Sequence, residues 1–541
     1  MPSISQTDAA LDKLATTAIE RTKALMKESD KLRDRREKAN RKRVARLFKD
    51  PKAIEATITL TDEVMRISSV KSSSRIFRRA AKKASIVGFG PINGIGLHAI
   101  GVLSHVLPTP VVAAVHQRVR ALSKDLILAS EADKLSRHMG KRTDKGISLN
   151  INVLGEAVLG DHEAELRFQS ILEMMRRPEV NYISVKLSSI VAQLIIIDVE
   201  GSITRVSEKM RILYREAQQH GVFVNLDMEE YRDLPMTVAA FMRVLDEDEF
   251  VSMKAGIVLQ AYLPEAHHFF GELVEWSIKR YERSGASIKV RLVKGANLAM
   301  ERAEAELHGW SAAPYRTKSD VDASYVRLVD AALRPEHSKA VRIGIASHNL
   351  FHMTWALEVA KSRGVVDQID IEMLEGMANA EALAVTRAGQ PVLLYAPVTR
   401  KDDFAAAVAY LVRRLDENTS DENYLKAAFE ISKNPAKFKE QEERFLKSIT
   451  ERHAITTQSL RHINHAQQTG QTFENEANAD PTEPKFIAAV SKAIKKVRAI
   501  KDQEIPLVIN GKEIFTKEQE EGTDPSDNGK VWYHYSVGSA K

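Results

Sequence analysis

The strongest constraint on the fold is a series of short β-rich runs that alternate with longer helical stretches. The eight runs are ISLNINVL (147–154), YISVKLS (182–188), VFVNLDM (222–228), GIVLQAYL (256–263), IKVRLVKGA (288–296), RIGIAS (342–347), IDIEMLEG (369–376) and VLLYAPV (392–398). Each run is followed by enough residues for a helix, and repeated βα units favour a closed parallel sheet. The sequence therefore predicts an α/β protein with a (β/α)8 TIM-type barrel over residues 147–435.

Helical and charged segments precede the predicted barrel. We expect a charged helical arm over residues 1–55 and an α-helical domain over residues 56–146, where apolar residues recur at helical spacing. Basic runs at 31–49 and 75–83 hold much of the excess in the net charge of +6. Two interpretations of these runs stay open: attraction to anionic lipid or nucleic acid, or the solvated face of a long helix.

Residues 85–107 form an apolar, glycine-dense stretch that is about long enough to span a membrane. Pro91, Asn93, His98 and His105 interrupt it. These residues favour a buried helical hairpin or a surface-seeking segment over a membrane span, and contact with a membrane surface stays open.

The chain has no cysteine, which excludes disulfides, thiolate metal sites and a cysteine nucleophile. His267 and His268 are adjacent, so their side chains point apart and predict no metal site. The N-terminal residues show no basic region followed by an apolar core, so we expect no secretory signal. The expected location is the cytoplasm, with peripheral contact at the cytoplasmic side of the membrane left open.

Polar side chains gather at the predicted carboxyl ends of the strands, where barrel enzymes carry their chemistry. They are Glu156, Lys186, Asp227, Gln260, Arg291, Lys294, His348, Asn349 and Tyr395. A purely structural barrel would not need this collection, although any one member could be a satisfied loop residue.

The predicted last helix of the barrel, residues 404–418, adds a second signal. One of its faces carries Tyr410, Arg413, Arg414 and Glu417. Adjacent arginines in an otherwise apolar helix can clamp a carboxylate through paired hydrogen bonds. The alternative for the helix alone is an exposed basic turn paired with acidic neighbours.

Nine phrases in these segments resemble the proline dehydrogenase domain of the bifunctional bacterial proline-utilization A proteins. They are INVLGEA, SVKLSS, NLDMEEYRDL, GIVLQAYL, VRLVKGA, ASHN, EMLEGM, LLYAPV and AYLVRRLDEN, all in the family order. The resemblance implies FAD-dependent oxidation of L-proline to 1-pyrroline-5-carboxylate, the first step of proline catabolism, with electrons passed to a membrane quinone.

The resemblance also implies roles for individual residues. Those implied to hold the proline carboxylate are Lys186, Arg413 and Arg414, and those implied to pack its ring are Ala296, Leu374, Tyr395 and Tyr410. Asp227 would order the site, and Glu156 would pair with Arg413 to close it. The implied FAD-binding residues are Val258, Gln260, Arg291, Lys294, Gly295, Thr317, Lys318, Ala346, His348, Asn349 and Glu417.

Two features refine these implied roles. Arg291 would place a cation near the reactive flavin nitrogen and stabilise the negative charge that develops there. Asn297 and Leu298 stand where the family usually has an aromatic pair, so we expect an altered proline affinity or flavin environment.

Beyond the barrel we expect a helical linker over residues 436–500 and an incomplete aldehyde dehydrogenase-like start over residues 501–541. Without a cysteine these residues cannot catalyse the second oxidation, that of glutamate semialdehyde. The chain is then a piece of a longer bifunctional enzyme, a shortened gene product or an engineered segment. The expected partners are L-proline, a membrane quinone, a separate or missing aldehyde dehydrogenase half, and further copies of the full-length chain.

Two other functions fit the sequence less well. A DNA-binding regulator is disfavoured, because the N-terminus is a long charged helix without the short opening strand that a ribbon-helix-helix requires. Another barrel flavoenzyme, such as a methylenetetrahydrofolate reductase relative, fits the fold, but its chemistry does not require the arginine pair.

Overall fold

The computed structural model describes the chain except for residues 1–3, 48, 68, 84–85, 156–157, 401–406, 408–409, 412–422, 465–472, 474, 501–502, 527–528 and 540–541. The described residues form two compact units, Met1–Ile195 with Val199–Asn464, and Ile196–Asp198 with His465–Lys541. Within them, no helix combines the length and the apolar character that crossing a membrane requires.

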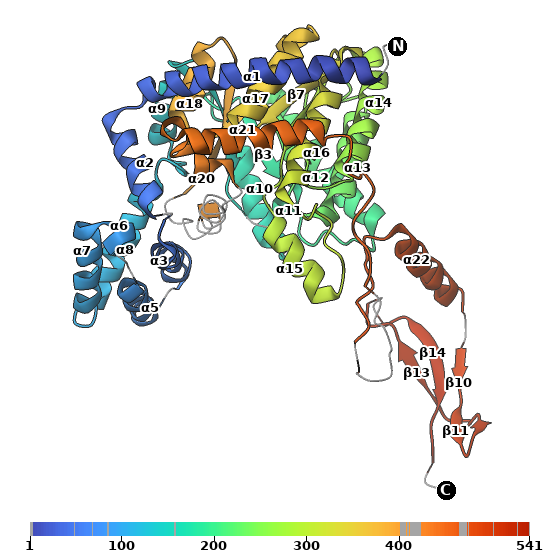
Figure 1. Ribbon diagram of the computed structural model, residues 1–541. Coiled ribbons are helices and arrows are strands. Elements are labelled where there is room, and N and C mark those ends of the chain that lie inside the picture. The colour runs from blue at the N-terminus through green and yellow to red at the C-terminus, as the bar shows by residue number, and fades with distance from the viewer. Residues whose placement is uncertain are drawn as a thin grey trace. The chain divides into compact units, whose positions relative to one another are not determined.

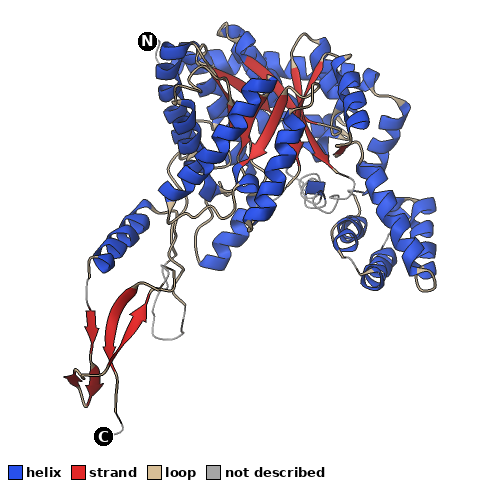
Figure 2. Cartoon of the chain, turned by 180° about the vertical axis from the view of Figure 1, so that it is seen from behind, coloured by secondary structure: helices blue, strands red, loops and turns tan. Residues whose placement is uncertain are grey.

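A closed parallel barrel forms the centre of the first unit. Its strands are β2 (Ile147–Val153), β3 (Tyr182–Lys186), β4 (Phe223–Asp227), β5 (Gly256–Gln260), β6 (Ile288–Val293), β7 (Val341–Ala346), β8 (Ile369–Leu374) and β9 (Val392–Thr399). Each strand pairs with the next along the chain, and β9 pairs with both β8 and β2, which closes the sheet. The predicted barrel and all eight of its predicted strands are confirmed, and Figure 2 shows the strands enclosed by helices.

The strand sequences explain why the barrel interior is polar at one end. Side chains alternate between the two faces of a strand. In β6 the outward face carries Ile288, Val290 and Leu292, which are almost fully buried, and the other face carries Lys289 and Arg291. Where β6 pairs with β7, Arg291 lies opposite Gly344. The polar residues of the strands therefore converge inside the barrel.

Helices cover the outside of the barrel. They are α10 (Asp161–Met175), α11 (Leu187–Ile190), α12 (Val199–His220), α13 (Leu234–Leu245), α14 (Ala266–Ser284), α15 (Leu298–His308), α16 (Lys318–Ala332), α17 (Leu350–Ser362), α18 (Asn379–Arg387), α20 (Tyr424–Ala428) and α21 (Pro435–Thr450). Short 3-10 turns are η1 (Tyr231–Asp233), η2 (Pro335–His337), η3 (Val366–Gln368) and η4 (Ile431–Lys433).

The N-terminal part is helical, as its periodicity predicts. Its elements are α1 (Ile4–Leu32), α2 (Arg35–Leu47), α3 (Pro51–Thr61), α4 (Glu63–Arg66), α5 (Val70–Lys83), α6 (Ile86–Phe89), α7 (Pro91–Leu103), α8 (Pro108–Ser123), the short strand β1 (Leu128–Ala129) and α9 (Ala132–Thr143). Helix α1 lies along α17 and α18 (Figure 1). Arg21 pairs with Glu358 at 2.5 Å, and the hydroxyls of Thr22 and Thr354 are 2.8 Å apart.

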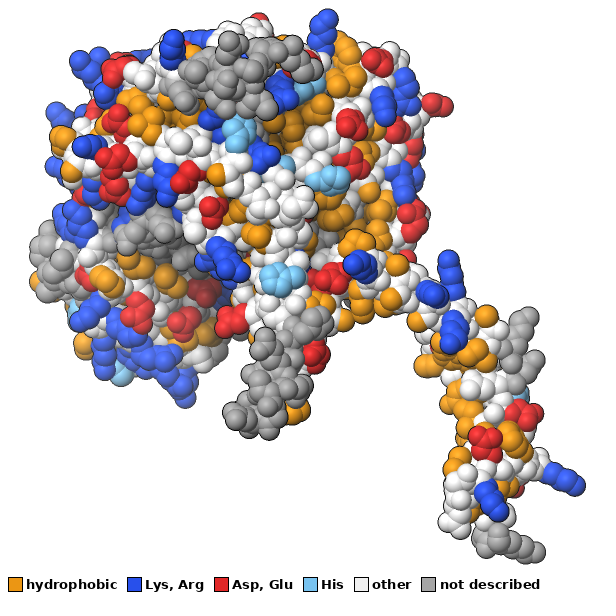
Figure 3. Space-filling view, turned by 45° about the vertical axis from the view of Figure 1, so that its right-hand side comes forward, with side chains coloured by type: hydrophobic (Ala, Val, Ile, Leu, Met, Phe, Trp, Pro, Cys, Tyr) orange, Lys and Arg blue, Asp and Glu red, His pale blue; other side chains and the backbone are white. Residues whose placement is uncertain are grey.

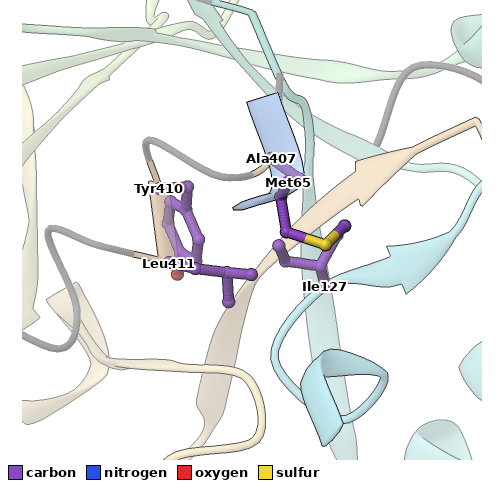
Figure 4. Packing of buried hydrophobic residues seen from close by; sticks show 5 residues of the cluster. All are labelled: Met65, Ile127, Ala407, Tyr410 and Leu411. Atoms are coloured by element: carbon purple, nitrogen blue, oxygen red, sulfur yellow. The ribbon is translucent and has the colours of Figure 1, made fainter. Parts of the chain in front are cut away.

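The helical region also packs against Ala407, Tyr410 and Leu411, which lie in the range of the predicted last barrel helix. Met65 of α4 and Ile127 form a buried cluster with Ala407, Tyr410 and Leu411, as Figure 4 shows. These contacts anchor Tyr410, a predicted site residue, from the outside of the barrel.

Residues 86–107 of the apolar stretch fold as helices and turns, but the buried alternative is wrong for several of its large side chains. Ile95, Val102, Leu103 and Val106 are 60%, 72%, 48% and 78% exposed. These side chains lie on α7 and the turn after it, and they point into solvent. The surface-seeking alternative fits these residues.

The second unit contains a helix and small sheets. Its elements are α22 (Pro484–Arg498), β10 (Gln503–Ile505), β11 (Leu507–Ile509), β12 (Lys512–Ile514), β13 (Gln519–Thr523) and β14 (Val531–Ser536). One sheet has the order β10-β14-β13, and β11 pairs with β12 as a hairpin. The predicted helical linker is interrupted, because residues 453–464 and 475–483 contain no helix.

Candidate active site at the carboxyl ends of the barrel strands

A cavity of about 350 Å³ lies at the carboxyl ends of the strands. It collects most of the predicted site residues: Lys186, Asp227, Val258, Gln260, Arg291, Lys294, Gly295, Ala296, Lys318, Ala346, His348, Asn349, Leu374, Tyr395 and Tyr410. Glu156, Arg413, Arg414 and Glu417 lie outside the described residues.

Thr317 is the described candidate that the cavity does not include. It is the N-cap of α16, and its hydroxyl accepts a hydrogen bond from the Asp320 backbone N–H at 3.1 Å. This capping satisfies one of the free N–H groups at the start of the helix. The hydroxyl is therefore already engaged in the fold.

Arg291 is the centre of the charged network. Its guanidinium donates to Glu372 Oε2 at 2.6 Å, to Asp227 Oδ1 at 2.8 Å and to Ser184 Oγ at 3.2 Å. It also lies 5.4 Å from the centre of the Tyr395 ring. Burial opposes its charge, but Glu372 and Asp227 outweigh burial and raise the pKa of Arg291 above its usual value. Arg291 is thus a fixed cation.

Asp227 connects this cation to the predicted substrate side. Its Oδ2 accepts a hydrogen bond from the Tyr395 hydroxyl at 2.8 Å. Burial first, and then the charge of Asp227, raise the pKa of Tyr395 well above its usual value. The phenol therefore stays protonated and acts as a donor.

A second buried cation, Lys289, contacts the same network. Lys289 Nζ lies 2.7 Å from Glu372 Oε1 and 2.9 Å from Asp370 Oδ2, and its side chain is only 4% exposed. Gly344 makes room for this pair, because a Cβ at that position would contact the Glu372 carboxylate. The barrel interior thus holds two cations and three carboxylates in mutual contact.

Lys186 ends β3 and faces the cavity. Its ammonium donates to Glu229 Oε1 at 2.8 Å, and both side chains are largely buried. The carboxylate keeps the ammonium directed to a defined place at the rim.

A third group lies on the wall formed by α16 and α17. Lys294 Nζ donates to Asp322 Oδ1 at 2.5 Å, lies 3.0 Å from His352 Nδ1, and shares Asp322 with Lys318. Burial lowers the pKa of Lys294 to about 7; Asp322 opposes this shift and Lys318 adds to it. Although burial raises it, Lys294 and Lys318 hold the pKa of Asp322 below its usual range.

Backbone and amide groups complete the cavity. Gly295 has φ of +121°, and a Cβ there would lie 2.5 Å from the Tyr262 ring, so no other residue fits without rearrangement. Gln260 is 2% exposed, and its Nε2 donates to the Glu229 carbonyl at 3.2 Å. Its Oε1 is buried and has no hydrogen-bond partner among the described residues. A ligand with an N–H donor would satisfy that atom.

His348 and Asn349 follow β7, and their side chains make different hydrogen bonds. The Leu374 backbone N–H donates to His348 Nε2 at 3.1 Å, so a neutral His348 ring carries its proton on Nδ1. The Asn349 side chain caps α17 through the Phe351 N–H at 3.0 Å. Asn349 is therefore structural at its side chain, while it still lines the cavity.

Several ionisable residues at the cavity were missing from the sequence-based set. They are Glu229, Asp322, His352, Glu372 and Arg444. The sequence gives a partial signal for Glu372, because Asp370, Glu372 and Leu374 lie on the same face of a predicted strand. The others follow strands or lie on helices, where the sequence gives no signal of the direction of a side chain.

Together these features define a (β/α)8-barrel protein with a charged cavity at the end of the barrel where such enzymes carry their chemistry. Among the described residues, no group of three His, Asp or Glu is placed to hold a metal ion.

Comparisons with known proteins agree with this class and narrow it. The family model described as proline dehydrogenase matches residues 135–427, more than half of the chain. The chain therefore belongs to the proline dehydrogenase family, as its motifs predict.

Individual relatives show how far the similarity extends. Proline dehydrogenase 2 of Bacillus subtilis is 26% identical over 282 residues, 51% of this chain and 80% of that protein. The bifunctional protein PutA of Klebsiella aerogenes is 23% identical over 329 residues, 58% of this chain. The match spans only 24% of that relative's length.

Solved structures of proline utilization A are similar as well. The Corynebacterium freiburgense protein is 42% identical with a TM-score of 0.61, over 72% of this chain and 38% of that one. The Bdellovibrio bacteriovorus protein, inactivated by N-propargylglycine, has a TM-score of 0.75 at 23% identity, over 97% of this chain and 53% of that one. The second likeness supports the fold.

Proposed function

We propose that this chain is a flavin-dependent proline dehydrogenase that oxidises L-proline to 1-pyrroline-5-carboxylate and passes the electrons to a membrane quinone. The proposal rests on one observation: the part of the chain that matches the family also forms the charged cavity. The family match covers the barrel, and the cavity of that barrel joins fixed cations to the predicted ring-packing residues Leu374, Tyr395 and Tyr410.

The substrate would bind by charge and shape. Lys186 offers an ammonium at the cavity rim, and the sequence places Arg413 and Arg414 as its partners in a carboxylate clamp. Glu229, 2.8 Å from Lys186, holds the ammonium in place until a carboxylate shares it. The apolar parts of Leu374 and Tyr410 suit a saturated five-membered ring.

The residues present fit a flavin dinucleotide. Gln260 Oε1, buried without a described partner, suits an imide N–H, and the wall at Lys294 and Lys318 suits a diphosphate. When bound, FAD supplies the hydride acceptor that protein side chains lack. Arg291 provides a preorganised positive charge inside the barrel, where negative charge would develop during the reaction.

The similarity to bifunctional relatives suggests a wider setting for this proposal. Because the match spans about a quarter of the bifunctional relatives, we propose an aldehyde dehydrogenase half as a partner, separate from these residues. We also propose a cytoplasmic enzyme that meets its quinone at the membrane surface, and homo-oligomers of the full-length protein. The divisions at residues 55, 146, 435 and 500 are proposed as its domain boundaries.

Replacing one cation tests the substrate assignment. Lys186→Met should raise the KM for L-proline by about 10- to 100-fold, since a charged hydrogen bond contributes roughly 1.5–3 kcal/mol, and should leave bound flavin unchanged. The assay is proline-dependent reduction of a dye, with Arg414→Met as a second variant of the same clamp. Lys209→Met removes a lysine of α12 that pairs with Glu165 outside the cavity, and serves as the control. An unchanged KM in both clamp variants would refute the carboxylate site.

A further inference from the structure

A hydrogen-bonded chain links α21 to the lysines of the cavity wall. Ser448 of α21 lies 3.2 Å from His352 Nε2, and His352 Nδ1 lies 3.0 Å from Lys294 Nζ. Lys294 then donates to Asp322 at 2.5 Å, and Lys318 donates to the same carboxylate. Residues from β6, α16, α17 and α21 thus meet at one wall.

The geometry fixes the state of the imidazole. The Ser448 hydroxyl donates to the Phe445 carbonyl at 2.6 Å, so it is an acceptor toward His352. His352 therefore carries its proton on Nε2, which leaves the Nδ1 lone pair facing the Lys294 ammonium. His352 and Ser448 are each 1% exposed. Burial first, and then Lys294, lower the pKa of His352 well below its usual value, so the ring is neutral.

The wall carries more positive than negative charge. One carboxylate, Asp322, faces two ammonium groups, and all three side chains line the cavity. The wall also includes the first turn of α16, a 15-residue helix that begins at Lys318. Backbone N–H groups at such a terminus favour anions.

We propose that His352 and Asp322 are positioning residues that present Lys294 and Lys318 to the diphosphate of a dinucleotide cofactor, with Ser448 orienting His352. The inference rests on the proposed flavin-dependent function. It adds α17 and α21 to the elements that determine cofactor affinity, although the family match ends at residue 427 and does not reach α21.

The charges around Lys294 predict a pH dependence. It faces Asp322 and Lys318 of α16, His352 of α17 and the Tyr325 ring 5.5 Å away, and Arg444 of α21 lines the same cavity. Since the pKa of Lys294 is lowered to about 7, a diphosphate must draw a proton onto it above that pH. Affinity should therefore be constant below pH 7 and fall, by at most about tenfold per pH unit, above it.

The test measures binding to the cofactor-free chain rather than turnover. FAD, riboflavin and ADP are titrated between pH 6 and pH 9, by flavin fluorescence or by calorimetry. His352→Leu should weaken FAD and ADP binding by about tenfold, because Lys294 loses an acceptor, and should leave riboflavin, which has no phosphate, unchanged. His352→Asn keeps an acceptor at the Nδ1 position and should restore most of the affinity.

Two further variants separate positioning from folding. His267→Leu removes another imidazole, which bonds Ser324 of α16 at 3.0 Å outside the cavity, and should change none of the affinities. Ser448→Ala should weaken FAD binding by a smaller factor, about two- to fivefold. If His352→Leu does not fold, this variant decides the question.

The inference is wrong if FAD binds His352→Leu and Ser448→Ala with the affinity and pH profile of the unmodified chain. It is also wrong if riboflavin and FAD are weakened equally, since that indicates general damage. Failure of the proposed function appears differently, as an unmodified chain that binds no flavin. In that case ADP binding and its loss in His352→Leu still test the diphosphate site.

Discussion

Single buried charges decide both the stability and the shape of this site. Glu372 receives Arg291 at 2.6 Å and Lys289 at 2.7 Å, and it is 3% exposed. Removing it would leave two buried cations with fewer partners. Breaking a buried pair in this way costs roughly 3–5 kcal/mol.

We therefore expect Glu372→Leu to lower the free energy of unfolding by about 3–5 kcal/mol, measured by urea denaturation. Glu247→Leu is the control, because Glu247 pairs with Arg211 at 2.8 Å where both side chains are about one-third exposed. That change should cost less than about 1 kcal/mol. Equal losses in the two variants would contradict the buried network.

The sequence located residues better than it located their partners. Lys186, Asp227 and Arg291 were readable because the end of a β-rich run marks the catalytic end of a barrel. Glu372 was not readable as the partner of Arg291, since the pair joins positions 81 residues apart. Thr317 stays a predicted cofactor-binding residue, and a threonine three residues before an aspartate is also a helix-start signal.

At the scale of elements, η1 and α15 hold an unusual group of carboxylates. Glu301 accepts the Tyr231 backbone N–H at 2.7 Å and is 2% exposed. Burial raises the pKa of Glu301 to about 7, and the charges of Glu304 and Glu230 add to this shift. The hydrogen bond from Tyr231 opposes it. The folded chain then binds a proton that the unfolded chain releases near pH 4.5. This contribution to stability is lost as the pH rises toward 7.

Glu301→Gln keeps an acceptor and cannot ionise. It should raise the free energy of unfolding by about 1–3 kcal/mol at pH 8 relative to the unmodified chain, with a much smaller gain at pH 5. Denaturant titrations at the two pH values measure the effect. Glu306→Gln, at an exposed position of the same helix, should show no such pH dependence. A gain that is equal at both pH values would contradict the role of ionisation.

The elements α5 and α7 bear on the proposed membrane contact. Exposed Arg75, Arg79, Lys82 and Lys83 lie on α5, and α7 exposes Ile95 and Val102. Figure 3 shows Lys and Arg side chains gathered at the lower left, the side where these helices lie in Figure 1. Apolar and basic groups together are the features that bind anionic lipid surfaces.

Replacing Arg75, Arg79, Lys82 and Lys83 of α5 by glutamine should weaken binding to anionic lipid vesicles, by about 1 kcal/mol for each charge near the surface. Vesicle co-sedimentation at constant salt measures it. Neutralising Lys279 and Arg283, exposed on α14, should have little effect. Unchanged binding in the α5 variant would exclude this surface.

For the whole molecule, the periodicity of the sequence was sufficient for the barrel but not for the arm around it. Strand runs and helices repeat in a fixed order, and the order determines the fold class. Helix α1 is predominantly polar, and the buried residues that the structure describes on it form one face against the barrel helices: Leu11, Ala15, Ala18, Ile19, Thr22, Leu25, Met26 and Ser29. Such a face predicts a helix but not the distant surface that it covers.

The whole sequence also bears on which of the two expected oxidations these residues can catalyse. The chain has no cysteine, so a second oxidation that depends on a cysteine nucleophile requires residues other than these 541. The cavity of the barrel, by contrast, contains buried cations and most of the described residues proposed for ring packing and cofactor binding in the first oxidation.

The most direct test of this account is an absorbance spectrum of the purified chain before and after L-proline is added without oxygen. The account predicts a flavin spectrum that L-proline bleaches and a dye acceptor restores. A flavin spectrum that L-proline leaves unchanged would contradict the assignment of this cavity to proline oxidation.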